Sequence, residues 1–399
     1  MKSADDPRGP LPWPDYIVHT IRELKERGLY RQLKILDSAP GAAVKVGRRS
    51  VLLFCSNDYL GLAADPRMKT AAVRAVRAWG TGVGASRLIS GNIALYRTLE
   101  QAVSKLKRVE AALVFASGYA TNVGVITSLA GPGDLILSDA LNHASIVDAC
   151  RLSKAEIAVY PHRDVHALEV LLRGRSTRGR VMIVTDGVFS MDGDLAPLPE
   201  LTALSRESGA LLVVDDAHGT GVIGPNGGGV FDYFGLKDPS ALQVGTFSKA
   251  LGSLGGFAAA SAQMVDFLVN HARSLIYSTG LPPSVLAANA EAIRIIIEEP
   301  NRRKHLHRLS SHLRDALGPL GFSLAEGPTP IIPLVVGDAE EAVRLSAYLW
   351  DEGIFVPPIR PPTVPEGQSR LRVSLSALHR QEDVDRLVYA IKDYFRQGS

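Results

Sequence analysis

A lysine and an acid–histidine pair each follow an apolar run of the sequence. Asp215 and His218 come after "LLVVD", and Lys249 comes after "ALQVGTF". Taken singly, an aspartate there could be a turn or cap residue, and a lysine a solvated surface charge. Lys249, however, lies in a loop of small residues between apolar segments, where partial desolvation lowers its pKa from about 10.4 and frees the amine. This pattern favours nucleophilic chemistry by the lysine amine.

The glycines that follow the acidic residue raise another interpretation. Gly219, Gly221 and Gly224 spell G-x-G-x-x-G. A dinucleotide-binding turn must lead into a helix whose first N–H groups meet the pyrophosphate. Pro225 and three consecutive glycines follow instead and cannot begin a long helix. The second match, "GTGVGA" at 80–85, follows a helical pattern rather than a strand. We therefore reject a nucleotide site.

The elements that must position these residues alternate along the chain. Segments 66–79 and 95–109 have helical periodicity. The strand-like apolar runs are "AALVFA", "DLILSD", "RVMIVTDG", "LLVVDDA" and "ALQVGTF". Such runs, separated by helices, are typical of a mostly parallel sheet covered on both faces. Ligands bind beyond the carboxyl ends of strands in these sheets, which is where Asp215 stands.

The length of 399 residues predicts more than one domain. A polar arm precedes a helix over 16–33, and short strands are expected near "AAVKV" and "SVLLFCS". After about residue 300 the pattern changes to helices near 301–318 and 339–351, strands near "IIPLVV", "IFVP" and "LRVSLS", and a final amphipathic helix. We predict an N-terminal arm, helix and small strands over 1–60, a large α/β domain over 61–298 and a smaller α+β domain over 299–399.

Composition excludes several classes of function. Hydrophobic residues make up 46% and charged residues 21%, ordinary values for a soluble protein. The net charge of +3 is spread out and the basic clusters lack aromatics, so we expect no nucleic-acid partner. No secretory signal and no apolar span of about 18 residues is found, so we expect no membrane partner. Cys55 and Cys150 are too few for a disulfide framework or a cysteine zinc site, and we expect a cytoplasmic protein without a metal.

A candidate anion anchor lies in "FASGYATNVGVITSLA", where a strand ends at Ser117 and Gly118 and a helix begins. The first N–H groups of such a helix attract a phosphate, although an ordinary helix start has the same pattern. Anchor, strand–Asp–x–x–His and strand–(Ser/Thr)–Lys, in this order, resemble the site of pyridoxal 5′-phosphate enzymes of the aspartate-aminotransferase fold (fold type I). In that resemblance Lys249 forms the Schiff base and Asp215 pairs with the pyridinium nitrogen.

Longer motifs, from "GLYRQL" to "RLRVSLSALH", extend the resemblance over nearly the whole chain. They include "SNDYLGL", "GASRLISG", "LSDALNHASIVDA", "TDGVFSMDGDLAPL", "VDDAHGTGVIG", "TFSKALGSLGG" and "LIYSTGLPP". The sequence resembles the α-oxoamine synthases, which condense an amino acid with an acyl thioester and release CO2. The fold implied is a seven-stranded, mostly parallel sheet domain with a smaller α+β domain. The segment "IRPPTVPEGQSRLRVSLSALH" favours the member that joins L-alanine to a pimeloyl thioester for biotin synthesis.

The resemblance implies a role for each matching residue. Lys249 is the Schiff-base lysine and proton shuttle, and Asp215 pairs with the ring nitrogen. His218 contacts the phenolic oxygen, and His143 stacks on the ring. The other implied cofactor contacts are Gly118, Tyr119, Ser190, Thr246 and, from a second subunit, Thr279. The implied substrate contacts are Arg372 and Asn57 for the amino-acid carboxylate, and Arg31, Arg360 and Thr363 for the acyl substrate. The Thr279 contact implies an obligate homodimer with shared active sites.

Some features keep alternatives open. Tyr96 stands where many relatives have a histidine, and Tyr119 replaces the phenylalanine of some relatives. Arg31 could be the solvated face of a helix, and Arg360 could form a loop salt bridge. Rival activities are acetyl transfer to glycine, against which Arg360 argues, and 5-aminolevulinate or sphingoid-base synthesis. An aminotransferase and a non-catalytic partner subunit are further rivals. The acyl carrier, coenzyme A or acyl-carrier protein, is also open.

Overall fold

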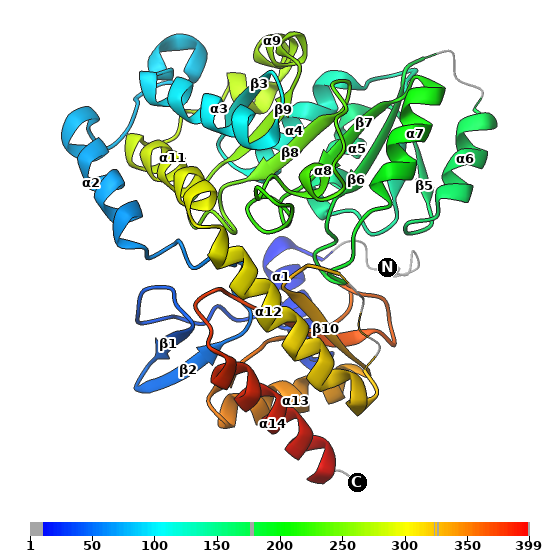
Figure 1. Cartoon of the computed structure of the whole chain (residues 1–399). Helices are drawn as coiled ribbons and strands as arrows, with labels where there is room; N and C mark the ends of the chain where they lie inside the picture. The colour runs from blue at the N-terminus through cyan, green and yellow to red at the C-terminus, as the bar shows by residue number, and fades with distance from the viewer. Residues whose placement is uncertain (1–10, 176–178, 323, 325–326, 398–399) are drawn as a thin grey trace.

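A seven-stranded sheet forms the centre of the larger domain in the computed structural model, which describes residues 11–175, 179–322, 324 and 327–397 (Figure 1). The strand order is β3-β9-β8-β7-β6-β4-β5. Strand β9 runs antiparallel to both of its neighbours, β3 and β8, and the other neighbouring strands pair in parallel, so the sheet is mostly parallel as predicted. The strands are β3 (Ala111–Phe115), β4 (Leu135–Asp139), β5 (Glu156–Tyr160), β6 (Val181–Asp186), β7 (Leu211–Asp215), β8 (Leu242–Thr246) and β9 (Gly256–Ala260).

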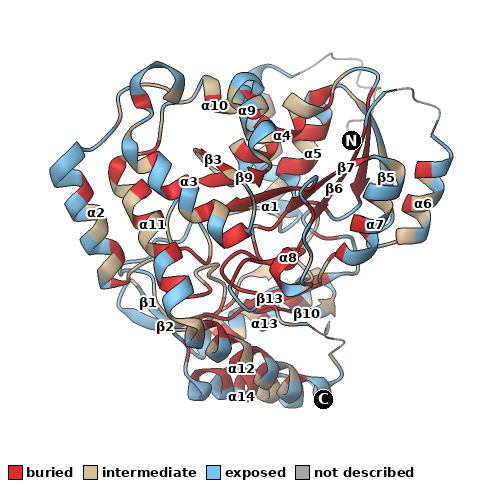
Figure 2. Ribbon diagram, turned by 45° about the horizontal axis from the view of Figure 1, so that its top comes forward, coloured by how far each residue is buried: buried red, intermediate tan, exposed pale blue. Residues whose placement is uncertain are grey.

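Helices cover both faces of this sheet, which explains why its central strands are buried at nearly every position (Figure 2). One face packs against α4 (Gly118–Leu129), α5 (Ala144–Ser153), α9 (Ala262–His271) and α10 (Arg273–Ile276). The other face packs against α3 (Ala94–Lys107), α6 (Val165–Arg173), α7 (Leu198–Ser208), α8 (Val230–Tyr233) and α11 (Pro283–Glu298). Helix α2 (Pro66–Trp79) lies against α11.

A smaller domain lies below the large sheet in Figure 1. One of its sheets has the order β10-β13-β12, and the other the order β1-β2-β11. Its strands are β1 (Ala43–Val46), β2 (Arg49–Leu53), β10 (Ile331–Gly337), β11 (Ile354–Phe355), β12 (Pro358–Ile359) and β13 (Ser369–Ser374). Its helices are α12 (Pro300–Leu317), the 3-10 turn η2 (Gly318–Leu320), α13 (Ala339–Asp351) and α14 (Gln381–Gln397). Because β2 pairs with β11, the N-terminal strands join the C-terminal part; the divisions at residues 60 and 298 stay predictions.

Two sequence expectations about local structure need correction. The helix expected over 16–33 is α1 (Trp13–Glu26), which ends early because Gly28 adopts a left-handed φ of +63°. Strands β5 and β9 were not expected. The sequence of β9, "GFAAA", lacks the β-branched residues that mark a strand, and only its burial between β3 and β8 makes it one. Apart from these corrections, a short π-helix, η1 (Arg87–Gly91), precedes α3. Among the described residues, no helix has the length and hydropathy needed to cross a bilayer.

Candidate active site

A cavity of about 190 Å³ lies at the carboxyl ends of β6, β7 and β8, and it gathers most of the residues predicted for the site. The predicted residues that line it are Gly118, Tyr119, His143, Ser190, Asp215, His218, Thr246 and Lys249. Ser117, Ser145, Asp186, Ala217 and Ser248 complete the lining. The position agrees with the rule that open α/β sheets bind ligands beyond the carboxyl ends of their strands.

Lys249 extends from the loop that joins β8 to β9 and is half-buried. Burial lowers the pKa of its ammonium to about 8, and the positive charge of Arg372 acts in the same direction. The carboxylates of Asp215 and Asp186 oppose this shift. A substantial share of the amine is therefore neutral, and so nucleophilic, near neutral pH.

Asp215 is the last residue of β7 and is 6% exposed. Its Oδ2 accepts a hydrogen bond of 2.6 Å from Nδ2 of Asn122, which lies in α4. Its Oδ1 accepts one of 2.9 Å from the backbone N–H of Ala217. These two donors fix the direction of the carboxylate at the floor of the cavity.

His218 is buried beside the cavity, where its Nδ1 lies 2.7 Å from the hydroxyl of Tyr59. Burial holds the pKa of His218 well below its usual value, and the positive charges of Lys249 and Arg372 lower it further. The imidazole is therefore neutral at physiological pH. A neutral ring can exchange a hydrogen bond with a ligand oxygen without adding charge to the site.

Arg372 comes from β13 of the smaller domain and is 8% exposed. It donates to Oδ1 of Asn57 at 3.2 Å and to the hydroxyl of Tyr59 at 3.1 Å. Its Nε donates to the backbone carbonyl of Ser190, a residue that lines the cavity. The structure thus brings the predicted pair Arg372 and Asn57 together, from opposite ends of the chain, beside the lysine cavity.

His143 caps the N-terminus of α5 and lies exposed at the cavity. Its Nδ1 is 2.7 Å from the hydroxyl of Ser145. Its backbone N–H donates to Oδ2 of Asp186 at 2.9 Å. These contacts hold the ring at the cavity, where it is free to stack on a planar ligand.

The start of α4 forms an anion cradle at one side of the cavity. Ser117 caps the helix, and its hydroxyl accepts from the N–H of Ala120 at 3.0 Å. Gly118 and Tyr119 are the first helical residues, whose N–H groups precede the intrahelical ladder. A Cβ on Gly256 would lie 2.6 Å from the carbonyl oxygen of Ser117. The start of α4 can therefore pack this closely against β9 only because residue 256 is a glycine. A phosphate-bearing planar aldehyde fits this donor set and the neighbouring lysine.

Besides Arg372 and Asn57, which lie beside the cavity, four predicted residues do not line it. Thr279 is exposed and its segment forms a β-bridge with Ser86. Arg360 donates to the backbone carbonyl of Gly28, and the N–H of Thr363 donates to the carbonyl of Arg360 at 3.1 Å. Arg31 is exposed. The roles of Thr279, Arg31, Arg360 and Thr363 stay predictions.

Among the residues missed by sequence reasoning, three contact or face the charged groups of the site: Asp186, Asn122 and Tyr59. Asp186 ends β6 in register with Asp215, and burial together with the Asp215 charge raises its pKa well above the usual value. The sequence could have identified Asp186, because "VMIVTDG" places an acidic residue at a strand end just as "LLVVDDA" does. Asn122 and Tyr59 had no such signal, since a helix interior and a loop deliver them to the site through the tertiary fold.

The glycines after Asp215 are explained by a buried ion pair. Nζ of Lys107 lies 2.5 Å from Oδ2 of Asp216, and both side chains are fully buried. A Cβ on Gly219 would lie 2.0 Å from one oxygen of that carboxylate, and a Cβ on Gly229 would lie 1.6 Å from the other. The following helix, α8, has only four residues, so the expectation that no long helix begins after these glycines is confirmed.

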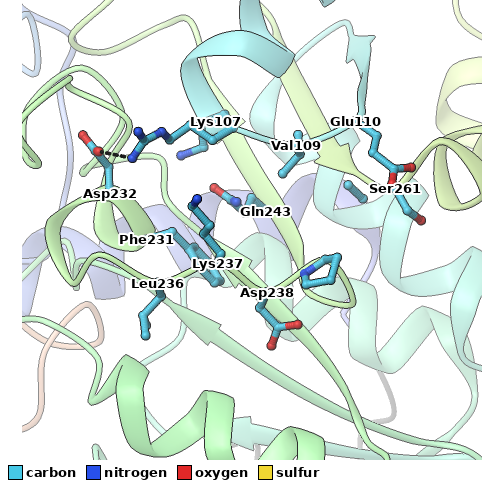
Figure 3. Close-up of a pocket in the computed structure, with 13 residues that line it drawn as sticks. Lys107, Val109, Glu110, Phe231, Asp232, Leu236, Lys237, Asp238, Gln243 and Ser261 are labelled. Carbon is cyan, nitrogen blue, oxygen red and sulfur yellow. Dashed lines mark ion pairs between the residues drawn. The ribbon is translucent and has the colours of Figure 1, made fainter.

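A second cavity, of about 400 Å³, opens near the start of β8 and the end of β9, away from the lysine site (Figure 3). Lys237, Asp238 and Gln243 surround it together with apolar side chains. Arg108 at its rim is paired with Asp232 at 3.6 Å. None of the predicted site residues lines it.

Comparisons with known proteins agree with this geometry. Residues 49–391 match the sequence model of the family described as "Aminotransferase class I and II". The chain is 51% identical to the 8-amino-7-oxononanoate synthase of Geobacter sulfurreducens, over 94% of this chain and 96% of the relative. It is 49% identical to the enzyme of the same name from Lysinibacillus sphaericus, over 95% and 97%.

Solved structures give the same picture. Serine palmitoyltransferase of Sphingomonas wittichii superposes with a TM-score of 0.92 at 33% identity, covering 98% of this chain and 99% of that one. A serine palmitoyltransferase that contains pyridoxal phosphate gives a TM-score of 0.91 at 30% identity, covering 96% and 97%. The 8-amino-7-oxononanoate synthase of Francisella tularensis gives 0.75 at 26% identity, covering 87% and 98%.

Proposed function

Since this chain belongs to the aminotransferase class I and II family, we propose that it is a pyridoxal 5′-phosphate-dependent acyltransferase of the α-oxoamine synthase type. The reaction condenses L-alanine with a pimeloyl thioester to give 8-amino-7-oxononanoate, CO2 and free thiol, a step of biotin synthesis. Relatives about half identical over most of the chain and bearing the name of that reaction support it. The observation that carries the proposal is the convergence of Lys249 and Asp215 at one cavity, with Arg372 beside it on the carbonyl of the lining residue Ser190.

The residues present fit the cofactor. Gly118 and Tyr119 at the start of α4 would hold its phosphate, and Asp215 its ring nitrogen. Ser190, Thr246 and His218 would complete the contacts, with His143 stacked on the ring. When bound, pyridoxal phosphate supplies an electron-accepting ring that stabilises negative charge at the α-carbon of the amino acid.

Arg372 and Asn57 bind the α-carboxylate of the amino acid in this proposal. A guanidinium offers two parallel donors to a carboxylate, which a lysine cannot. Arg372 is already fixed by Ser190, Ser374 and Asn57. The amino acid is therefore oriented by a preorganised group, with its Cα–H directed to Lys249.

Lys249 moves the proton at the α-carbon. Its neutral amine removes the proton when the amino acid is bound, and its ammonium returns a proton after carbon–carbon bond formation and loss of CO2. The lowered pKa of about 8 suits both steps, because the base and acid forms coexist near that pH. Asp215 would offer its carboxylate to the ring nitrogen of the cofactor.

The acyl substrate meets Arg360, Arg31 and Thr363. Arg360 lies in the segment "IRPPTVP" and its guanidinium contacts the carbonyl of Gly28, so the loop and the N-terminal segment adjoin. An arginine suits the distal carboxylate of a pimeloyl chain. Acetyl transfer to glycine, the main alternative within the family, has no use for such a group.

A homodimer completes the site in this proposal, with Thr279 reaching the phosphate of the partner subunit. Thr279 is exposed, and its segment carries Tyr277, which is 71% exposed. The β-bridge between Ser86 and Thr279 places this segment beside η1, where Ile89 is 81% exposed. Exposed apolar side chains of this kind mark interaction surfaces.

We also propose that the protein is cytoplasmic, which agrees with its two free cysteines.

Absorbance of the purified protein with pyridoxal phosphate tests the proposal, followed by separate titrations with L-alanine and glycine. We expect a visible band that shifts with L-alanine. A shift with glycine alone would favour acetyl transfer instead. The absence of any band would contradict the assignment of the cofactor.

A further inference from the structure

The loop 187–195, between β6 and α7, is where the two domains meet at the site. It carries Ser190, whose carbonyl accepts from Nε of Arg372. From the smaller domain, Arg370 donates to the carbonyl of Met191 at 3.3 Å, and the hydroxyl of Thr329 donates to the carbonyl of Gly193 at 2.6 Å. The position of Arg372 therefore depends on the position of this loop.

His162, just after β5, holds the other side of the loop. Its Nε2 lies 2.9 Å from Oδ2 of Asp194, in the loop, and its Nδ1 lies 3.0 Å from Oδ1 of Asp139, at the end of β4. A neutral imidazole carries only one N–H, so one of its nitrogens would face a carboxylate without a proton between them. The imidazolium donates to both carboxylates, and such charge-assisted bonds are the stronger kind.

The charges of the groups around His162 balance only when its imidazole is protonated. Arg163 donates from its backbone N–H to Asp139 at 2.9 Å and from Nη1 to Asp194 at 3.0 Å. The ring of Phe189 lies edge-on to the imidazole, with centroids 4.3 Å apart. Tyr160 and Asp186 also lie close enough for the charge of Asp139 to raise the pKa of each. Two carboxylates thus face two cations, and loss of the imidazolium charge leaves one negative charge uncompensated.

We propose that His162 is a positioning residue: its imidazolium fixes the loop 187–195 and, through the carbonyl of Ser190, sets the place of Arg372 for the amino-acid carboxylate. This inference rests on the proposed function for the identity of the substrate. The hydrogen bonds of His162 are to Asp139 and Asp194, neither of which lines the lysine cavity, and His162 was not among the residues predicted from the sequence.

The pH dependence of this contact has a definite sign. The two carboxylates raise the pKa of His162 to about 9, against the effect of burial. Because the folded value lies above the ordinary 6.5, the stabilisation is fully present below that value and is lost as the pH rises through about 9. Below about pH 8 His162 holds the loop through Asp194, and above about pH 9 this charge-assisted contact is lost.

Replacement of His162 in the holoenzyme tests the proposal. For His162→Gln we expect the KM for L-alanine to rise about tenfold while kcat changes less than about threefold, since the binding geometry is lost and the proton-transfer groups are kept. His166→Gln, an exposed histidine on α6, is the matched control and should leave both constants unchanged. In the wild type the KM should rise between about pH 7.5 and 9.5, and His162→Gln should lack this rise.

Two measurements distinguish failure of the proposed role of His162 from failure of the proposed function. The difference in Tm between apo wild type and His162→Gln should shrink as the pH rises through about 9, whatever the reaction. A folded His162→Gln enzyme with an unchanged KM for L-alanine would overturn the proposal; if that variant does not fold, Asp194→Asn serves in its place with the same expected rise. Failure of the wild type to release thiol would contradict the proposed function, and amino-acid binding followed by absorbance would then decide the role of His162.

Discussion

At the scale of single residues, the site depends on a lysine whose charge is disfavoured and an aspartate whose direction is fixed. Desolvation lowers the pKa of Lys249 to about 8, while Asn122 and Ala217 hold the carboxylate of Asp215. The lysine supplies a neutral amine near physiological pH, and the aspartate a fixed negative charge at the floor of the cavity. Two predictions concern Lys249.

The first prediction is that Lys249→Ala abolishes turnover, with a loss of at least about 10³-fold, because both the nucleophile and the proton carrier are removed. The comparison is a thiol-release assay at saturating substrates. Lys237→Ala, an exposed lysine at the second cavity, is the control and should keep wild-type activity. Near-normal turnover by Lys249→Ala would remove Lys249 from the mechanism.

The second prediction concerns the rate at which the apoenzyme captures pyridoxal phosphate. Only the neutral amine reacts, so the rate should rise about tenfold between pH 7 and pH 9 and level off above about pH 8.5. With the ordinary lysine pKa of 10.5 the rise would be about a hundredfold with no levelling. Stopped-flow absorbance at a series of pH values distinguishes the two courses.

At the scale of elements, strand ends and glycine loops place these residues. Asp186 and Asp215 end the adjacent strands β6 and β7, and Lys249 comes just after the next strand, β8. The loop after β7 wraps around the buried carboxylate of Asp216, which Lys107 neutralises. This ion pair holds α3 against the loop that follows Asp215.

The third prediction is that Lys107→Met destabilises the fold by about 3–5 kcal/mol, because Asp216 is then a buried charge without its cation. Chemical denaturation measures the free energy of unfolding. Lys105→Met, on the same helix but exposed, should change it by less than about 0.5 kcal/mol. Equal stability of the two variants would show that the buried pair contributes nothing.

Much of this arrangement could be predicted from the sequence, for physical reasons. Apolar runs separated by helices indicated the parallel sheet, and an acid or lysine at a strand end indicated the site edge, as with Asp215 and Lys249. Strand β9 was missed because its glycine and alanine residues become a strand only through burial between neighbours. Asn57 and Arg372 are 315 residues apart, so no local pattern could pair them, and they were found only through the family resemblance.

At the scale of the whole molecule, the site is complete only when the domains are docked. Lys249 and Asp215 belong to the large sheet, whereas Arg372 comes from β13 of the smaller domain, and Tyr59 bridges the two by contacting both Arg372 and His218. Relative movement of the domains would therefore change the distance between Arg372, which binds the amino-acid carboxylate in the proposed function, and Lys249.

The fourth prediction concerns assembly. We expect the wild type to sediment as a dimer of about 85 kDa, twice the 42.7 kDa chain. Ile89→Asp places a charge on the exposed apolar surface beside Thr279, and should yield monomers with little activity. Val159→Asp, another exposed apolar position, is the control and should remain dimeric and active. A fully active monomer would contradict the shared site.

The most direct test of the account is to identify the product of the purified enzyme by mass spectrometry. The enzyme is supplied with pyridoxal phosphate, pimeloyl-coenzyme A and L-alanine, and in parallel with acetyl-coenzyme A and glycine. We predict that the first pair gives 8-amino-7-oxononanoate, with one CO2 and one free thiol for each molecule formed, and that the second pair gives negligible product. Formation of 2-amino-3-oxobutyrate from the second pair, with no product from the first, would contradict it.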